Sequence, residues 1–166
     1  MLNKYKIEIK WAFIFIAVSL LWMVLEKLSG LHSIHIDKHY YLTNLFAIPA
    51  VWIFVLALQD KKKNFYNGLM NFKQGFISGL IITLIVAIFS PVTQWIITYI
   101  ITPEYFPNVI EHSLETGYHK TREEAEAFFS YKNFALQSTI GALVMGIVTS
   151  LFVSFFVRTK TKNQLI

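Results

Sequence analysis

Three histidines of this chain, His32, His35 and His39, recur at three- and four-residue steps. On a helix this spacing places side chains on one face, and a group of neutral imidazoles suits zinc, copper or nickel. The glycine and serines around Leu31 argue against a helix there. Solvated histidines also need no ligand, so these residues are candidates only, and we expect no bound metal and no cofactor.

A second polar set, Glu111, Glu115 and His119, also repeats at four-residue steps in an acidic segment. The chain has no cysteine, which excludes disulfides, thiolate metal ligands and thiol nucleophiles. No acid, base or nucleophile stands at a spacing typical of a catalytic or nucleotide-binding motif. We therefore expect a non-enzymatic protein.

Uncharged polar residues form a third candidate group. Asn44, Gln94 and Gln137 are expected toward one side of the membrane, where they could converge near Pro91. Two interpretations remain open: hydrogen bonds that hold helices together, or a small polar cavity that is open to the outside.

The elements that must position these residues are four apolar runs without Asp, Glu, Lys or Arg, at 11–25, 40–59, 74–103 and 133–157. Hydrophobic residues make up 55% of the chain and charged residues 15%. At about 1.5 Å per residue, runs of this length match a bilayer core of about 30 Å. The sequence predicts an all-α integral membrane protein, one domain over 1–166, with spans at about 8–28, 40–59, 74–101 and 133–157.

Residues at the ends and bends of these spans refine the prediction. The first run is short, so Lys10 and Glu26 are expected to extend their charged groups toward the nearer headgroup layers. Pro49 should kink the second span, and Pro91 should bend the third.

The segment 103–132 is expected to form an external helical hairpin between the third and fourth spans. Thr102, Pro103 and Glu104 resemble a helix start, and Gly117 a helix end. Thr121 and Glu124 form a capping-box pattern that opens a second helix, which should continue into the fourth span.

Charges are sorted by sign between the connecting segments. Both termini and the second connection carry ten Lys or Arg residues against Glu8 and Asp60, a net charge of +8, whereas the other connections carry −3. This asymmetry predicts cytoplasmic termini, and it favours lipid contact over nucleic-acid binding.

Small residues follow a four-residue repeat in two spans: Gly75, Gly79, Thr83 and Ala87 in the third, and Ala142, Gly146 and Ser150 in the fourth. Lipid gives helices no hydrophobic reason to associate, so close backbone approach over small residues drives their packing. We expect these stripes to face each other and alanine replacements of Gly79 and Gly146 to be mild; the alternative is that one stripe forms a homodimer contact.

Three stretches, "ITPEYFPNVIEH", "TREEAEAFF" and "QSTIGALVMGIVTSLFVSFF", together with "GFISGLIITLIVAIFSPVTQWI", resemble the small four-span bacterial membrane proteins known as domain of unknown function 4199. The resemblance implies the bacterial inner membrane and this topology. It implies no catalytic residue.

Together these patterns favour a structural or accessory membrane component whose acidic external hairpin meets a membrane or periplasmic protein. The alternative is a small-molecule transporter or channel element that uses the polar group of Asn44, Gln94 and Gln137.

Overall fold

The computed structural model describes residues 2–160, with side chains from residue 4 onward, and these residues contain helices and turns but no β-strand. The helices are α1 (Leu2–Leu28), α2 (Ile36–Leu42), the 3₁₀ turn η1 (Thr43–Phe46), α3 (Ala47–Asn64), α4 (Phe72–Ile96), the π-helical turn η2 (Ile97–Ile101), α5 (Tyr105–Glu115), α6 (Arg122–Phe128) and α7 (Tyr131–Val157).

Four helical segments are long and apolar enough to cross a bilayer: Lys4–Leu28, Ile36–Asn64, Phe72–Ile101 and Tyr131–Val157. The predicted fold class, an all-α membrane protein with four spans, is therefore confirmed. A helical hairpin, α5 and α6, separates the last two spans.

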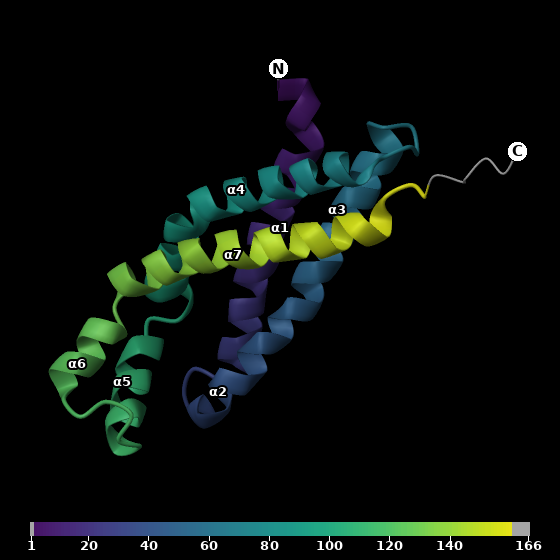
Figure 1. Cartoon of the computed structure of the whole chain (residues 1–166). Coiled ribbons are helices and arrows are strands. Elements are labelled where there is room, and N and C mark those ends of the chain that lie inside the picture. The colour runs from purple at the N-terminus through teal and green to yellow at the C-terminus, as the bar shows by residue number, and fades with distance from the viewer. Residues whose placement is uncertain (1, 161–166) are drawn as a thin grey trace, which may run out of the picture.

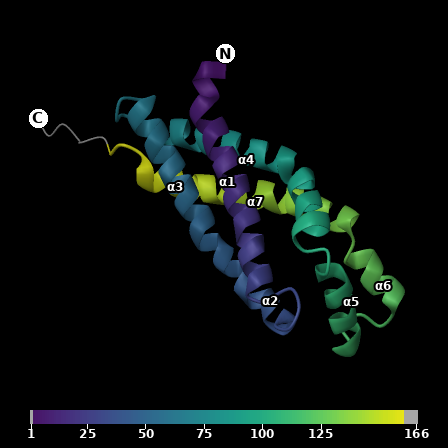
Figure 2. The ribbon, with the colours of Figure 1, turned by 180° about the vertical axis from the view of Figure 1, so that it is seen from behind.

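Two pairs of helices make up the membrane domain. In Figure 1, α4 and α7 run side by side in opposite directions and cross α1 and α3, and Figure 2 shows the same arrangement from behind. The N-terminal end of α1 and the turn between α3 and α4 lie at one end of the molecule, while α2, α5 and α6 lie at the other (Figure 1).

The α4–α7 contact is built on small residues in an antiparallel register. A Cβ atom added to Gly79 would lie 2.5 Å from Oγ of Ser150, and one added to Gly146 would lie 2.5 Å from Oγ1 of Thr83. Gly75 faces Ser154 in the same way, at 3.2 Å. The register, continued by one turn, sets Ala87 opposite Ala142, so the two stripes line one helix–helix contact.

This close approach corrects the expectation that alanine would be tolerated at these glycines. A Cβ atom at Gly79 would also lie 2.6 Å from Cβ of Ser150 and 3.3 Å from its Cα. The backbones must therefore move apart to admit even a methyl group, because the opposing atoms are not the free end of a flexible side chain.

The two prolines of the membrane spans lie at different positions in their helices. Pro49 is the third residue of α3, directly after η1, so the turn that its ring contacts is 3₁₀ and not α-helical. The regular α-helix of the second span, Ile36–Asn64, is interrupted at η1, in the turn before the proline that was expected to kink it. Pro91 lies inside α4, and its carbonyl oxygen accepts a hydrogen bond of 3.2 Å from the Tyr131 hydroxyl.

Capping side chains fix the ends of the hairpin and of α7. The Thr121 hydroxyl accepts from the Glu124 backbone N–H, as its sequence pattern predicts, and the Glu124 carboxylate accepts from the Lys120 N–H. Ser130 caps α7 and separates it from α6, which ends at Phe128. The expected continuous helix from the hairpin into the fourth span is therefore broken by a serine cap.

Candidate functional site

A buried carboxylate lies at the end of α1 that is remote from the N-terminus. Glu26 is 2% exposed, because the chain folds back over it after α1 ends. Gly30 makes this reversal possible with a φ of +78°, a left-handed conformation that a side chain would strain. The N–H of Leu31 then bonds to the Glu26 carbonyl oxygen at 3.0 Å, and His32 follows, 1% exposed.

Two imidazoles meet one oxygen of this carboxylate. Oε2 of Glu26 lies 3.1 Å from Nε2 of His32 and 3.3 Å from Nε2 of His39, which α2 supplies. The other oxygen, Oε1, accepts a hydrogen bond from the indole N–H of Trp22, one turn earlier on α1. We refer to Glu26, His32 and His39 as the carboxylate–histidine cluster; their three facing atoms lie within 4.8 Å of one another and could hold one metal ion.

Helix α5 closes the cluster from the hairpin side. The Tyr105 hydroxyl lies 3.3 Å from Nδ1 of His39, and the tyrosine ring lies 5.0 Å from each imidazole centroid. The side-chain amide of Asn108 donates to the His32 carbonyl oxygen at 2.8 Å. Burial raises the pKa of the Tyr105 phenol well above its usual value, so this hydroxyl stays neutral at physiological pH.

The structure separates the three histidines that the sequence offers as metal ligands. His32 and His39 join the cluster, whereas His35 is exposed and is not part of it. Glu26 does not extend toward a headgroup layer as the sequence suggested: its partners are inside the protein. Sequence reasoning missed Glu26 and Tyr105 as members of this group, although an acid within the predicted first span, 8–28, is a signal for a buried partner.

A small cavity lies against the cluster. Its volume is about 190 Å³, and its wall includes His39, Thr43, Gln94, Thr102 and Tyr105. The cavity therefore lies between one imidazole of the cluster and the polar end of α4.

A larger cavity lies deeper, between all four spans. It measures about 390 Å³, and the lining comes from α1, η1, α3, α4, η2 and α7. Thr43, Gln94 and Ile97 line both cavities, so the two share a wall. We call the larger one the intramembrane cavity. It reaches Thr83 and Gly146 at the α4–α7 contact.

The polar groups of the intramembrane cavity are neutral, and many of their protons are already used. The hydroxyls of Thr83, Ser90 and Ser138 donate to backbone carbonyls of their own helices. The Gln94 amide donates to Thr98, and the Asn44 amide donates to the Tyr40 carbonyl oxygen. The wall thus offers mainly oxygen acceptors, and its lining includes no Asp, Glu, Lys, Arg or His.

The expected polar group is only partly assembled. Asn44 and Gln94 line the intramembrane cavity, but Gln137 does not: it is exposed, and the next residue, Ser138, lines the wall instead. The reason is helix geometry, since one residue step turns a side chain by about 100°.

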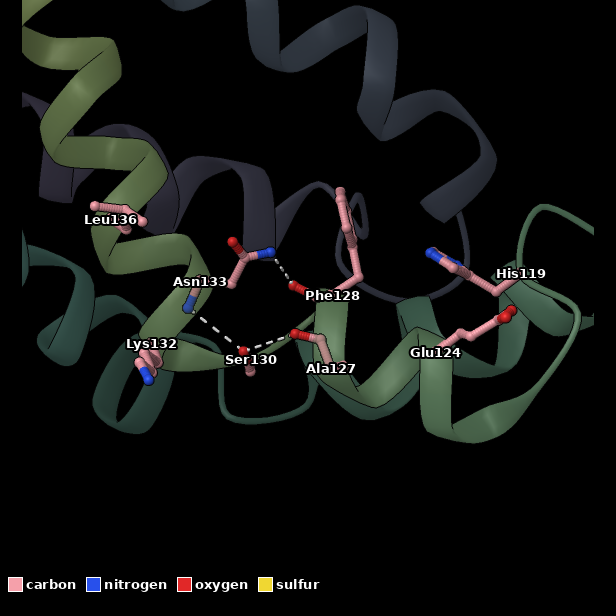
Figure 3. Close-up of a pocket in the computed structure, with 8 residues that line it drawn as sticks. All are labelled: His119, Glu124, Ala127, Phe128, Ser130, Lys132, Asn133 and Leu136. Carbon is pink, nitrogen blue, oxygen red and sulfur yellow. Dashed lines mark hydrogen bonds between the residues drawn. The ribbon is translucent and has the colours of Figure 1, made fainter.

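A third, open depression lies where α6 meets α7 (Figure 3). It measures about 640 Å³, with His119 and Glu124 at one end and Asn133 at the other. The Asn133 amide donates to the Phe128 carbonyl oxygen, and the Ser130 hydroxyl donates to that of Ala127 (Figure 3). These two bonds cap the end of α6, and the Ser130 hydroxyl caps α7 by accepting from the Asn133 backbone N–H, so we interpret this region as a structural connection between the two helices.

A second buried carboxylate, Glu8, lies near the other end of α1. Lys61 of α3 donates to both of its oxygens, at 2.9 and 3.1 Å, and the Ser78 hydroxyl of α4 donates at 2.7 Å. Glu8 and Lys61 are 1% and 2% exposed. This paired and fully bonded group joins three helices, and it is structural.

Comparison with known proteins places the chain in a family but gives no function. No curated protein and no solved structure shows significant similarity to it. One family model matches residues 10–159, which include most of the first span, the other three spans, Glu26 and the hairpin. The chain therefore belongs to the family described as protein of unknown function (DUF4199).

Proposed function

We propose that this protein is a non-enzymatic membrane protein that binds a neutral amphipathic small molecule in the intramembrane cavity. The observation that carries the proposal is a cavity of about 390 Å³ lined by all four spans, within the usual size range of ligand pockets. A cavity of this kind favours ligand binding over a purely structural role, which would be better served by a solid bundle.

The chemistry of the wall defines the class of ligand. The lining carries no charged side chain, so an ionic headgroup would lose its hydration without compensation. The hydroxyl protons of Thr83, Ser90 and Ser138 are already donated to backbone, which leaves oxygen atoms that accept. A ligand with hydroxyl or amide donors and an apolar body, such as a monoacylglycerol, fits these properties.

The position of the exposed lining residues supports entry from the bilayer. Ala47 and Val51 on α3, and Gly141 and Met145 on α7, line the cavity and are also exposed on the membrane-spanning surface. An amphipathic molecule dissolved in lipid reaches this surface without crossing water.

A binding experiment with a matched pair of variants tests the proposal. Full-length protein in lipid nanodiscs is titrated with a pyrene-labelled monoacylglycerol, and binding is read as tryptophan-to-pyrene energy transfer. Gly141→Phe fills the cavity from a position where an added Cβ meets no atom within 4 Å. Ile140→Phe, on the neighbouring exposed position, does not line the cavity and is the control.

We expect saturable binding that Gly141→Phe weakens at least 10-fold and Ile140→Phe leaves unchanged. Oleate, which has the same chain but a carboxylate headgroup, should compete poorly. Equal binding by both variants, or preferred binding of oleate, would show that the cavity is not a site for a neutral ligand.

We further propose that the protein lies in the bacterial inner membrane with both termini in the cytoplasm and the hairpin outside. The charge asymmetry of the connecting segments supports this orientation. Reporter fusions at Gly68 and Gly117, two turn glycines with positive φ and no atom within 4 Å of an added Cβ, test it. Cytoplasmic reporter activity from the Gly117 fusion would show that the hairpin lies in the cytoplasm and that the proposed orientation is wrong.

A second candidate function is partner binding through the hairpin. The specific observation is its exposed acidic surface, formed by Glu111, Glu115, Glu123, Glu124 and Glu126. Such a surface suits a basic segment of a membrane or periplasmic protein. Crosslinking in native membranes should then depend on charge: Glu115→Lys combined with Glu123→Lys should abolish a crosslinked band, and an unchanged band would exclude this role.

A further inference from the structure

The carboxylate–histidine cluster lies outside the intramembrane cavity and is not explained by ligand binding there. We propose that Glu26, His32 and His39 bind a divalent transition-metal ion, with zinc as the best match, and that the ion ties α1 to α2 beneath the hairpin. This proposal does not rest on the cavity or its ligand.

The distances within the cluster match the edges of a metal site. Zinc lies about 2.0–2.2 Å from imidazole nitrogen and carboxylate oxygen, so two ligands at a tetrahedral angle are about 3.3 Å apart. Oε2 of Glu26 lies 3.1 and 3.3 Å from the two Nε2 atoms.

Charge gives a second, independent reason. Glu26 is 2% exposed, and within the described part of the chain its only ion-pair partners are the two imidazoles. The adjacent Lys27 points elsewhere: its ammonium bonds to the Ile101 carbonyl oxygen and pairs with Glu104. A buried carboxylate needs a compensating positive charge, and a divalent ion held by neutral imidazoles supplies one.

Hydrogen bonding alone does not account for burying His32. This side chain is 1% exposed, yet its Nδ1 atom has no hydrogen-bond partner among the residues that the structure describes. Its other nitrogen makes the 3.1 Å contact with Glu26. A metal bond at Nε2 provides the energy that the missing hydrogen bonds do not.

The surroundings of Glu26 and His39 resemble the outer shell of a metal site. Ligating carboxylates and imidazoles are usually oriented by hydrogen bonds through their other polar atoms. Trp22 donates to the second oxygen of Glu26, and the Tyr105 hydroxyl can accept from Nδ1–H of His39. His39 is 18% exposed, which gives an ion access from outside.

Metal titration of the full-length protein tests the proposal. Protein purified in detergent without a histidine tag is stripped with chelator and titrated with ZnCl₂ against a competing fluorescent chelator. We expect one zinc per chain and a rise in thermal stability. Co²⁺ should give the visible absorption typical of a tetrahedral site, whereas Ca²⁺ and Mg²⁺, which prefer oxygen ligands, should not compete.

Three variants and one matched control separate this site from adventitious binding. Glu26→Gln and His39→Gln each remove a ligand and should weaken zinc binding more than 100-fold. Tyr105→Phe removes only an orienting hydroxyl and should weaken it by about 10–100-fold. His35→Gln, an exposed histidine in the same segment, is the control and should change nothing.

Zinc affinity that is unchanged in folded Glu26→Gln and His39→Gln would overturn the proposal, as would an equal loss in His35→Gln. If Glu26→Gln does not fold, His39→Gln and the stoichiometry and Co²⁺ spectrum of the wild-type protein decide. A failure to bind zinc would not contradict the proposed binding of a monoacylglycerol. None of the three residues Glu26, His32 and His39 lines the intramembrane cavity.

Discussion

The two buried glutamates of α1 occupy the same helix face and differ in what they meet. Glu8 and Glu26 are 18 residues apart, five full turns or about 27 Å along the helix, and both are almost completely buried. Glu8 bonds to the ammonium of Lys61, while Glu26 bonds to two imidazoles and an indole. The same side chain on the same face therefore forms an ion pair with lysine at one end and a carboxylate–histidine cluster at the other.

The difference lies in the partner groups. The Lys61 ammonium donates to both oxygens of Glu8, so the two charges form a direct ion pair inside the protein. Neutral imidazole is a common metal ligand, so the two histidines offer Glu26 partners that a metal ion can share. One end of α1 is thus suited to holding helices together, and the other to responding to a ligand.

The largest expected effect comes from breaking the fixed pair. Lys61→Met should leave the Glu8 charge buried without its counter-ion and lower the free energy of unfolding by about 3–5 kcal/mol. The measurement is equilibrium unfolding in mixed detergent micelles. The double variant with Glu8→Leu should recover much of this loss, and strictly additive effects of the two substitutions would show that the residues are not coupled.

The next variant compares the two carboxylates directly. In metal-free protein, Glu26→Gln replaces the charged acceptor that meets Trp22 and the two imidazoles, so the loss of these hydrogen bonds should cost about 1.5–3 kcal/mol. Glu8→Gln, the matched substitution, should cost more, because it strands the Lys61 ammonium. The same unfolding assay measures both, and a larger loss from Glu26→Gln would mean that the cluster, and not the ion pair, is the main structural contact of α1.

The α4–α7 contact allows the stability cost of losing a buried charge to be compared with the cost of separating two packed helices. Gly79→Ala and Gly146→Ala should each cost about 1–3 kcal/mol, because the new methyl group meets Ser150 or Thr83. Gly141→Ala, where a Cβ meets no atom within 4 Å, is the control and should be neutral or slightly stabilising. Thermal unfolding in detergent distinguishes the two classes, and equal melting temperatures would show that the helices separate without cost.

The smallest expected effect concerns the surface of the hairpin. Arg122 pairs with Glu111 and, one turn along α6, with Glu126, and the hydrogen bond to Glu111 raises the pKa of the guanidinium. Both carboxylates are more than half exposed. Because water and salt screen such pairs, Glu111→Gln should not measurably shift the melting temperature. A clear destabilisation would show that the hairpin is held by charge as strongly as α1 is.

The sequence by itself determined the features that depend on local periodicity. The four spans follow from uncharged apolar runs, and the caps at Thr121 and Gly117 from residue preferences within a few positions. The stripe of Gly75, Gly79 and Thr83 also identified a helix face, because side chains four residues apart share a face whatever the partner helix is.

Only the tertiary structure decided which polar groups meet. Asn108 bonds to His32 from 76 positions away, and Ser78 reaches Glu8 across 70. No local pattern separates His39, which meets Glu26, from His35, which is exposed, since both belong to the same three- and four-residue spacing. His39 meets Glu26 because the chain turns at Gly30 and because Tyr105 packs against His39. The partners of a buried polar group are thus fixed by the packing of distant segments and not by its neighbours in sequence.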